Sequence, residues 1–333
     1  MLSSTHSSNQ QPANALGALG VSVQELIGLK MQSKKIHLGL SNRVRSVLAG
    51  NHTSKFRGRG MDFAESRRYQ NGDDARHIDW RVTARTQQPH SKLYIEERER
   101  PVFILVDFSP TMFFGSKPCL KTVTACRLAA LLAWAGATRG DRIGGIVAHD
   151  QGFADLKPKP GNRGVLRLAT ALADASVRWP DFTQPQATSP LTSGNALNRA
   201  LSHGLRVSHP GSLVIIISDF FAFNDDCVGQ FHQLARHNDL MLFEISDPLE
   251  HIAPPAGRYG ISDGRTKVLL DTRIKGSRAQ FGLRYSQKHQ AIHQLARRNN
   301  LSLMEINNGD DLVQVLSERF TRRSVARTPK TGS

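Results

Sequence analysis

Residues 102–108 read VFILVDF and continue as SPTM over residues 109–112. A continuous apolar run of this length, ending next to an aspartate, is typical of a strand that is buried on both faces of a sheet. The run SLVIIISDF at 212–220 has the same form and also ends at an aspartate. These two stretches predict the centre of a parallel sheet, and the rest of the chain is arranged around them.

Helical patterns separate the apolar runs. The predicted strands are 102–108, 142–150, 212–220, 240–247, 267–272 and 301–307, and the predicted helices are 119–138, 165–176, 194–205, 227–237, 281–300 and 310–323. Strands that alternate with helices form a parallel sheet with helices on both faces. The expected fold class is therefore α/β, with a doubly wound, mostly parallel sheet.

The chain changes character at Pro101. We expect a disordered lead over 1–20, which is rich in Ser, Gln and Asn, and an N-terminal helical and basic, Gly/Arg-rich segment over 21–100. The α/β domain is expected over 101–323, with a tail over 324–333. The segment before Pro101 reads as amphipathic helices near its start and irregular turns later.

Charge is distributed unevenly along the 333 residues, which carry a formal net charge of +16. Counted from the sequence, residues 34–100 carry 15 basic and 8 acidic side chains, residues 101–257 carry 13 of each, and residues 258–333 carry 15 and 6. A neutral body thus lies between two basic segments. Nucleic acid, an acidic lipid surface and an acidic protein all remain possible partners for such segments.

The composition limits the compartment and the class of protein. No apolar run approaches the roughly 20 residues that a membrane-spanning helix requires, and the N-terminus lacks the pattern of a secretory signal. Three cysteines without a CxxC pair are interpreted as buried thiols in a reducing compartment. The predicted location is cytoplasmic.

Oxygen-bearing side chains gather where the central strands end. Asp107, Ser109 and Thr111 follow one strand, and Asp219 ends the other. Such ligands suit Mg²⁺ or another divalent cation, which often keeps water or an outside carboxylate in its coordination sphere. A third loop, 188–194, offers hydroxyls from Thr192 or Ser193. The predicted metal ligands are Asp107, Ser109, Thr111, Thr192, Ser193 and Asp219.

The pattern DFSPT resembles the metal-ion-dependent adhesion site of von Willebrand factor A-like domains, whose signature is D-x-S-x-S, then a Thr, then an Asp. Thr111 replaces the second serine and keeps a hydroxyl. No G-G-T motif marks the second loop, so the choice between Thr192 and Ser193 stays open. The resemblance implies a cation-dependent binding domain.

A longer resemblance covers roughly residues 30–320. The stretches GRGMDFAESRRYQNGDDARHIDWRVTART at 58–86 and ERERPVFILVDFSPTM at 97–112 resemble domain-of-unknown-function family 58. The resemblance implies a von Willebrand factor A-like domain and a partnership with MoxR-type AAA+ ATPases and related von Willebrand factor A-like proteins. The charged segment GDDARHIDW at 72–80 has two interpretations: a carboxylate–guanidinium network that holds the segment in shape, or an interaction surface around Trp80.

Enzyme motifs are absent or incomplete in the sequence. The stretch DFSPT differs from the phosphatase motif D-x-D-x-[TV] because Ser109 stands where a second aspartate would act as general acid and base. The sequence has no GxxxxGK[ST] phosphate loop and no GxSxG elbow. His289 and His293 are spaced i, i+4 on a predicted helix, but without an intervening glutamate they are interpreted as part of a solvated face.

We therefore expect a non-enzymatic, divalent-cation-dependent protein-interaction module that acts as an adaptor or cofactor of a MoxR-type AAA+ ATPase. The alternative is a nucleic-acid-binding protein that uses its basic flanks. Few aromatic residues accompany those basic side chains, and no nucleic-acid-binding motif is present in the sequence. A cryptic hydrolase is the third possibility.

Overall fold

The structure is a computed structural model that describes residues 17–36, 38, 61–70, 75–96, 101–116, 118–149, 152–178, 196–262 and 267–325. The chain divides into two compact units. The first consists of Met1–Ser41 and Arg100–Ser333, and the second of Asn42–Glu99. The expected grouping of residues 21–100 into one segment differs from this division, because residues near the N-terminus pack on the helices of the first unit.

Six strands form the central sheet of the first unit. In spatial order they are β10 (Ser302–Asn307), β7 (Asp239–Ser246), β6 (Leu213–Ser218), β3 (Pro101–Phe108), β4 (Arg142–His149) and β5 (Gly152–Pro160). Every neighbouring pair is parallel except β4 with β5, which is antiparallel. The predicted mixed α/β fold with a mostly parallel sheet is confirmed.

Strand β5 was not predicted from the sequence. It reads GFADLKPKP and contains Lys157, Pro158, Lys159 and Pro160. Proline cannot donate to a strand ladder, and lysine discourages further pairing, so both are typical of an edge strand. The half-exposed edge position explains why no apolar run marks this strand.

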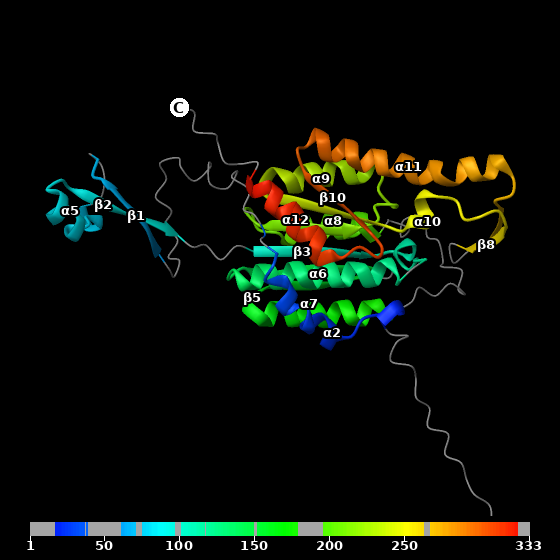
Figure 1. Cartoon of the computed structure of the whole chain (residues 1–333), viewed down its shortest axis with the longest axis horizontal. Helices are drawn as coiled ribbons and strands as arrows, with labels where there is room; N and C mark the ends of the chain where they lie inside the picture. Colours follow the sequence, from blue (N-terminus) through cyan, green and yellow to red (C-terminus); the bar gives the residue numbers. More distant parts are fainter. Residues whose placement is uncertain are drawn as a thin grey trace, which may run out of the picture. The chain divides into compact units, whose positions relative to one another are not determined.

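Helices cover both faces of the sheet (Figure 1). One face carries α6 (Lys121–Thr138), α7 (Gly161–Ser176) and α12 (Leu312–Val325), and the other carries α8 (Ala196–Val207), α9 (Asp225–His237) and α11 (Lys275–Arg298). The short helices α2 (Val23–Gly28) and α3 (Lys30–Ser33) pack against α6. Trp134 of α6 donates its indole N–H to the Leu26 carbonyl at 3.0 Å, which fixes this contact.

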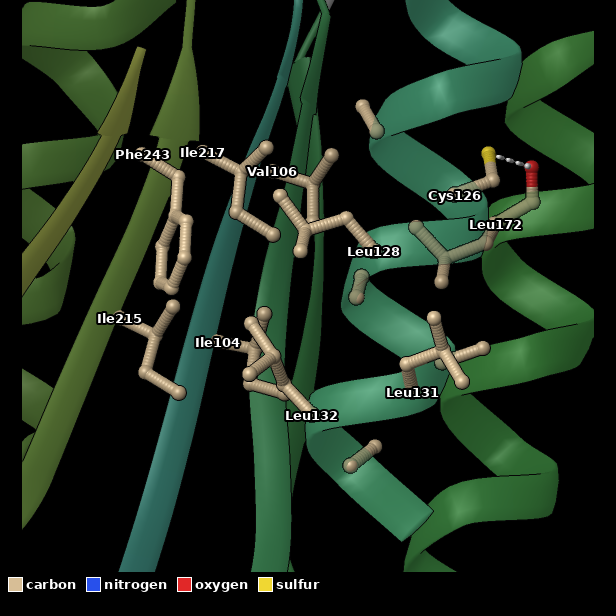
Figure 2. Close-up of a cluster of buried hydrophobic side chains, with 14 of the residues drawn as sticks. Ile104, Val106, Cys126, Leu128, Leu131, Leu132, Leu172, Ile215, Ile217 and Phe243 are labelled. Atoms are coloured by element: carbon tan, nitrogen blue, oxygen red, sulfur yellow. Dashed lines mark hydrogen bonds between the residues drawn. The ribbon is translucent and has the colours of Figure 1, made fainter. Parts of the chain in front are cut away.

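The core between the sheet and α6 is continuous (Figure 2). Leu128 and Leu132 of α6 face Ile104 and Val106 of β3, while Leu131 lies toward α7. Burying each such side chain contributes about 1.5–3 kcal/mol. Because α6 has the sheet on one side and α2, α3 and α7 on others, it is apolar on nearly every face. The three cysteines are free and buried, as predicted.

Two small sheets complete the described structure. In the second unit, β1 (Met61–Arg68) pairs antiparallel with β2 (His90–Glu96) beside the helix α5 (Trp80–Thr86). In the first unit, β8 (Arg258–Ser262) pairs antiparallel with β9 (Lys267–Asp271), so the strand predicted at 267–272 exists but lies outside the central sheet. Among the described residues, none of the helices combines the length and apolar character needed to cross a membrane.

The segment GDDARHIDW lies in the second unit, and its first three residues are outside the described part of the chain. Asp79 caps α5 by accepting hydrogen bonds from the backbone N–H groups of Arg81 and Val82, both at 3.2 Å, and its other oxygen accepts from the Ser66 hydroxyl at 2.8 Å. Trp80 is 70% exposed. The segment thus has both a structural aspartate and an exposed aromatic ring.

Candidate functional site

The candidate site lies where the chain reverses its direction of travel across the sheet. From β3 the chain moves to β4 on one side, and it later returns to β6 on the other side and continues outward to β7. Ligand sites of doubly wound sheets occur at the carboxyl ends of the strands at such a switch point. Asp107 at the end of β3 and Asp219 after β6 stand on the two sides of this point.

Asp107 is a fully buried carboxylate held by its neighbours. One oxygen accepts a hydrogen bond from the Ser109 backbone N–H at 2.9 Å, and the other accepts from the Ser218 hydroxyl at 2.6 Å. Burial raises the pKa of Asp107 to about 7, with a further contribution from the negative charge of Asp219. The hydrogen bonds from Ser218 and Ser109 act in the opposite direction.

Ser109 and Thr111 present adjacent hydroxyl groups next to this carboxylate. Ser109 precedes the single helical turn Pro110–Met112, which brings Thr111 back toward it. Their hydroxyl oxygens lie 3.2 Å apart, and the Ser109 hydroxyl is 3.3 Å from Asp107 Oδ2. The predicted convergence of Asp107, Ser109 and Thr111 is therefore present in the structure.

Asp219 does not stand alone, because Lys121 pairs with it. Lys121 begins α6, its side chain is inaccessible to solvent, and its Nζ lies 2.8 Å from Asp219 Oδ2 and 2.5 Å from Glu250 Oε1. The second Asp219 oxygen accepts from the Phe221 backbone N–H at 3.0 Å. Sequence reasoning missed Lys121 and Glu250, since no local signal connects positions so far apart in the chain.

The charges of Lys121, Asp219 and Glu250, here called the triad, stabilise one another. Burial opposes the ammonium form of Lys121, but the two carboxylates outweigh it and hold the Lys121 pKa above its ordinary value. Burial and the nearby Asp219 raise the pKa of Glu250, while Lys121 opposes that rise. Glu250 is also fixed by α10 (Pro248–His251), where its Oε2 accepts from the Asp247 backbone N–H at 2.8 Å.

Asp247 ties this corner to the loop after β3. Its oxygens accept hydrogen bonds from the Ser116 backbone N–H at 2.8 Å, from the Ser116 hydroxyl at 2.7 Å and from the Asn308 side-chain amide at 3.1 Å. Burial alone would raise the pKa of Asp247, but these hydrogen bonds outweigh burial, and the pKa is lowered. Asp247 therefore anchors the residues around the site through the hydrogen bonds that its carboxylate accepts.

Backbone strain accompanies the site at Phe220. This residue follows Asp219 and has a φ of 50°, in the left-handed region that side-chain-bearing residues seldom adopt. Its N–H donates to the Ser218 hydroxyl at 2.9 Å, and its ring is completely buried. Strained conformations of this kind cluster at functional sites and persist only where packing enforces them.

Thr192 and Ser193 lie outside the described residues, as does the rest of the loop 188–194. The interpretation of His289 and His293 as part of a solvated face is wrong: each side chain is 27% exposed and lies beside the buried carboxylate of Glu244. No local pattern in the sequence places Glu244, on a strand, next to this helix.

Comparison with known proteins identifies relatives but assigns no activity. The family described as "Protein of unknown function DUF58" matches residues 65–292. Uncharacterized protein Rv1480 of Mycobacterium tuberculosis and uncharacterized protein Mb1516 of Mycobacterium bovis are each 26% identical over 258 residues, covering 78% of this chain and 78% of the relative. The conserved hypothetical protein BatB from Bacteroides thetaiotaomicron is 16% identical, with a TM-score of 0.41, over 68% of this chain and 99% of the other.

Proposed function

The chain belongs to the DUF58 family of proteins of unknown function, and on that premise we propose that it is a divalent-cation-dependent protein-interaction module without catalytic activity. The proposal treats the α/β unit as a von Willebrand factor A-like domain. The protein would act in the cytoplasm as an adaptor or cofactor of a MoxR-type AAA+ ATPase, together with related von Willebrand factor A-like proteins.

The proposal is supported mainly by two neighbouring hydroxyls, of Ser109 and Thr111, which lie next to the Asp107 carboxylate at the switch point of the sheet. The Ser109 and Thr111 oxygens are 3.2 Å apart. In an octahedral Mg²⁺ site with bonds of 2.0–2.1 Å, neighbouring ligand oxygens are about 2.9 Å apart. A small adjustment of either side chain would let both hydroxyls bind one ion, so the residues present fit this metal.

The remaining donors would act from a greater distance. Asp107 is engaged by three hydrogen-bond donors, and one oxygen of Asp219 is held by Lys121. Both carboxylates can contribute through bound water, as Mg²⁺ commonly keeps part of its hydration shell. The bound ion would supply a positive charge and open coordination positions for an outside oxygen ligand.

Weak binding of the ion by the free protein follows from the local charge. Lys121 offsets the charge of Asp219, and a proton competes with the metal at Asp107, whose pKa is raised to about 7 by burial. An Asp or Glu of a partner would add the missing negative charge and fill an open position. The metal and the acidic partner would then bind cooperatively, each increasing the affinity for the other.

The test is a surface plasmon resonance titration of the purified protein against a purified MoxR-type ATPase. We expect binding to disappear with chelator and to return with added Mg²⁺. Higher salt should slow association without abolishing it, because screening affects exposed charges more than a coordinated pair. Thr111→Val should lose binding, while Thr111→Ser, which keeps the hydroxyl, should retain it. Equal affinity with and without chelator would contradict the proposal.

The nucleic-acid alternative rests on charge alone. Lys34 and Lys35 are exposed. The Lys288 side chain of α11, by contrast, donates a hydrogen bond from Nζ to the Phe223 carbonyl at 2.7 Å and so has a structural contact. Addition of duplex DNA to the same titration distinguishes the two functions. Salt-sensitive binding of DNA that displaces the ATPase would favour the alternative.

A further inference from the structure

A second group of potential metal ligands lies on β7 and β10, on the β10 side of the switch point. Glu244 belongs to β7, and Glu305 is its direct neighbour in register on the parallel strand β10. His289 and His293 approach both carboxylates from α11. Two carboxylates side by side repel each other, so the arrangement favours a cation between them.

The distances between these side chains match a tetrahedral site. Glu244 Oε2 lies 3.1 Å from His289 Nδ1 and 3.6 Å from His293 Nε2, and Glu305 Oε1 lies 3.1 Å from His293 Nε2. Zn²⁺ bonds of about 2.0–2.1 Å in tetrahedral geometry place neighbouring ligand atoms about 3.3–3.4 Å apart. Ligand atoms of Glu244, His289 and His293 all fall within 4.8 Å of one another.

The Nε2 atom of His293 faces both carboxylates. It is buried and lies 3.1 Å from Glu305 Oε1, within ion-pair distance but without the alignment of a regular hydrogen bond. Burial and the neighbouring His289 lower the pKa of His293. A metal ion between this nitrogen and the two carboxylates would bind all three groups at once.

We propose that Glu244, His289 and His293 bind one Zn²⁺ ion, with Glu305 beside the fourth coordination position. Two imidazoles and one carboxylate are a ligand set that zinc takes in proteins, and three protein ligands leave a position for water or a further carboxylate. Glu244 is 2% exposed and supplies a desolvated carboxylate, whereas Glu305 at 49% exposure lies at the solvent side.

The ligands are packed against neighbouring side chains, and open space borders one of them. A cavity of about 390 Å³, lined by His293, Arg297, Asn300 and Leu303 among others, lies next to His293. The rings of His289 and His293 are 4.1 Å apart, and Tyr285 stacks on His289 at 5.6 Å. This packing along α11 holds the imidazoles in place before a metal arrives.

Zinc would join α11 to the β7–β10 edge of the sheet. Glu244 is in register with Ser218, the residue before Asp219, so the two groups of ligands are neighbours on the sheet. They share no side chain, and the zinc proposal does not depend on the proposed function. Binding of zinc to the native state alone would also stabilise the fold by mass action.

The test is a competition titration of Zn²⁺ between the full chain and a chromophoric chelator, with excess Mg²⁺ present throughout. Three proteins are compared: the wild type, His293→Gln and the matched control His203→Gln. His203 forms an ordinary histidine–carboxylate pair with Asp155 at 2.9 Å, distant in the chain from the proposed ligands. We expect one Zn²⁺ per chain in the wild type and in the control, and at least about a 100-fold loss of affinity in His293→Gln, since even outer-shell partners contribute 10–100-fold.

Thermal unfolding with and without Zn²⁺ checks that the variants fold. Zinc should raise the Tm of the wild type and His203→Gln but not that of His293→Gln. Should His293→Gln fail to fold, Co²⁺ titration of the wild type replaces it, because tetrahedral nitrogen and oxygen ligands give intense visible bands without a thiolate charge-transfer band. Equal zinc affinity in all three proteins, no stoichiometric binding by the wild type, or thiolate bands with Co²⁺ would each overturn the proposal.

Discussion

Asp107 is fully buried and lies in the field of the negative charge of Asp219, and its protonation therefore affects stability. Its pKa rises from 3.8 to about 7 on folding, chiefly through burial. Between those values the folded protein binds more protons than the unfolded chain, so the free energy of unfolding falls as pH rises through this window. The full contribution is present below about pH 4 and is lost above about pH 7. Glu244, whose pKa burial also raises to about 7, adds to the same trend.

Replacement of Asp107 by asparagine should remove part of this dependence. We predict that Asp107→Asn, in chelator, is more stable than the wild type at pH 8 and shows a smaller loss of stability between pH 4 and 7. The two proteins should differ in their loss of unfolding free energy between pH 4 and 7 by at most about 4 kcal/mol, at roughly 1.4 kcal/mol per pKa unit. Urea denaturation at several pH values measures it. Parallel stability curves for the two proteins would show that Asp107 does not titrate in this range.

Lys121 is the second residue whose chemistry depends on burial. We predict that Lys121→Met destabilises the protein by about 3–5 kcal/mol at pH 8, because the variant leaves the Asp219 and Glu250 carboxylates without their shared cation. The loss should shrink at low pH, where the carboxylates become protonated, and Mg²⁺ should offset part of it. Lys35→Met, at an exposed position, is the control and should change stability by no more than about 0.5 kcal/mol. An unchanged stability of Lys121→Met would mean that the triad has no net energetic role.

At the scale of elements, the register of β3 and β4 depends on a glycine. Gly145 lies opposite Ile104, and a Cβ atom there would meet the Ile104 carbonyl oxygen of the neighbouring strand. Because β3 carries Asp107 at its end, the β3–β4 pairing positions one half of the candidate site. The other half follows from the pairing of β3 with β6.

A methyl group at position 145 should force these strands apart. We predict that Gly145→Ala lowers the free energy of unfolding by about 1–3 kcal/mol or more, as overpacking does in well-packed cores. Gly229 in α9 has no heavy atom within 4 Å of the equivalent Cβ position and provides the comparison. Gly229→Ala should stabilise the protein by up to about 1 kcal/mol, from helix propensity. Equal effects at the two positions would contradict the packing described for β3 and β4.

At the scale of the whole molecule, the central strands and their order of appearance could be predicted, whereas the partners of buried charges could not. Burial on both faces leaves a continuous apolar run, so β3 and β6 are visible in the sequence with Asp107 and Asp219 at their ends. The edge strand β5 faces solvent and has no such signal. Lys121 stands 98 and 129 residues from its carboxylates, and local patterns carry no information on contacts over that separation.

The same limit explains the histidines of α11. Their spacing alone is compatible with a solvated helix face, and only the placement of the helix over β7 brings them to Glu244. The two candidate metal sites thus differ in origin. The Ser109 and Thr111 site consists of residues close together in the chain at a strand end. The Glu244 and histidine site forms only because α11 packs on β7.

The proposed cation site is formed by the hydroxyls of Ser109 and Thr111 at the switch point of the sheet. It is tested most directly by calorimetric titration of Mg²⁺ into the wild type, Thr111→Ser and Thr111→Val, at pH 8 and with the zinc-binding residues intact. We predict one Mg²⁺ per chain for the wild type and Thr111→Ser, and at least about tenfold weaker binding for Thr111→Val, which corresponds to about 1.4 kcal/mol. Identical titrations for all three proteins, or no Mg²⁺ binding by any of them, would contradict the claim.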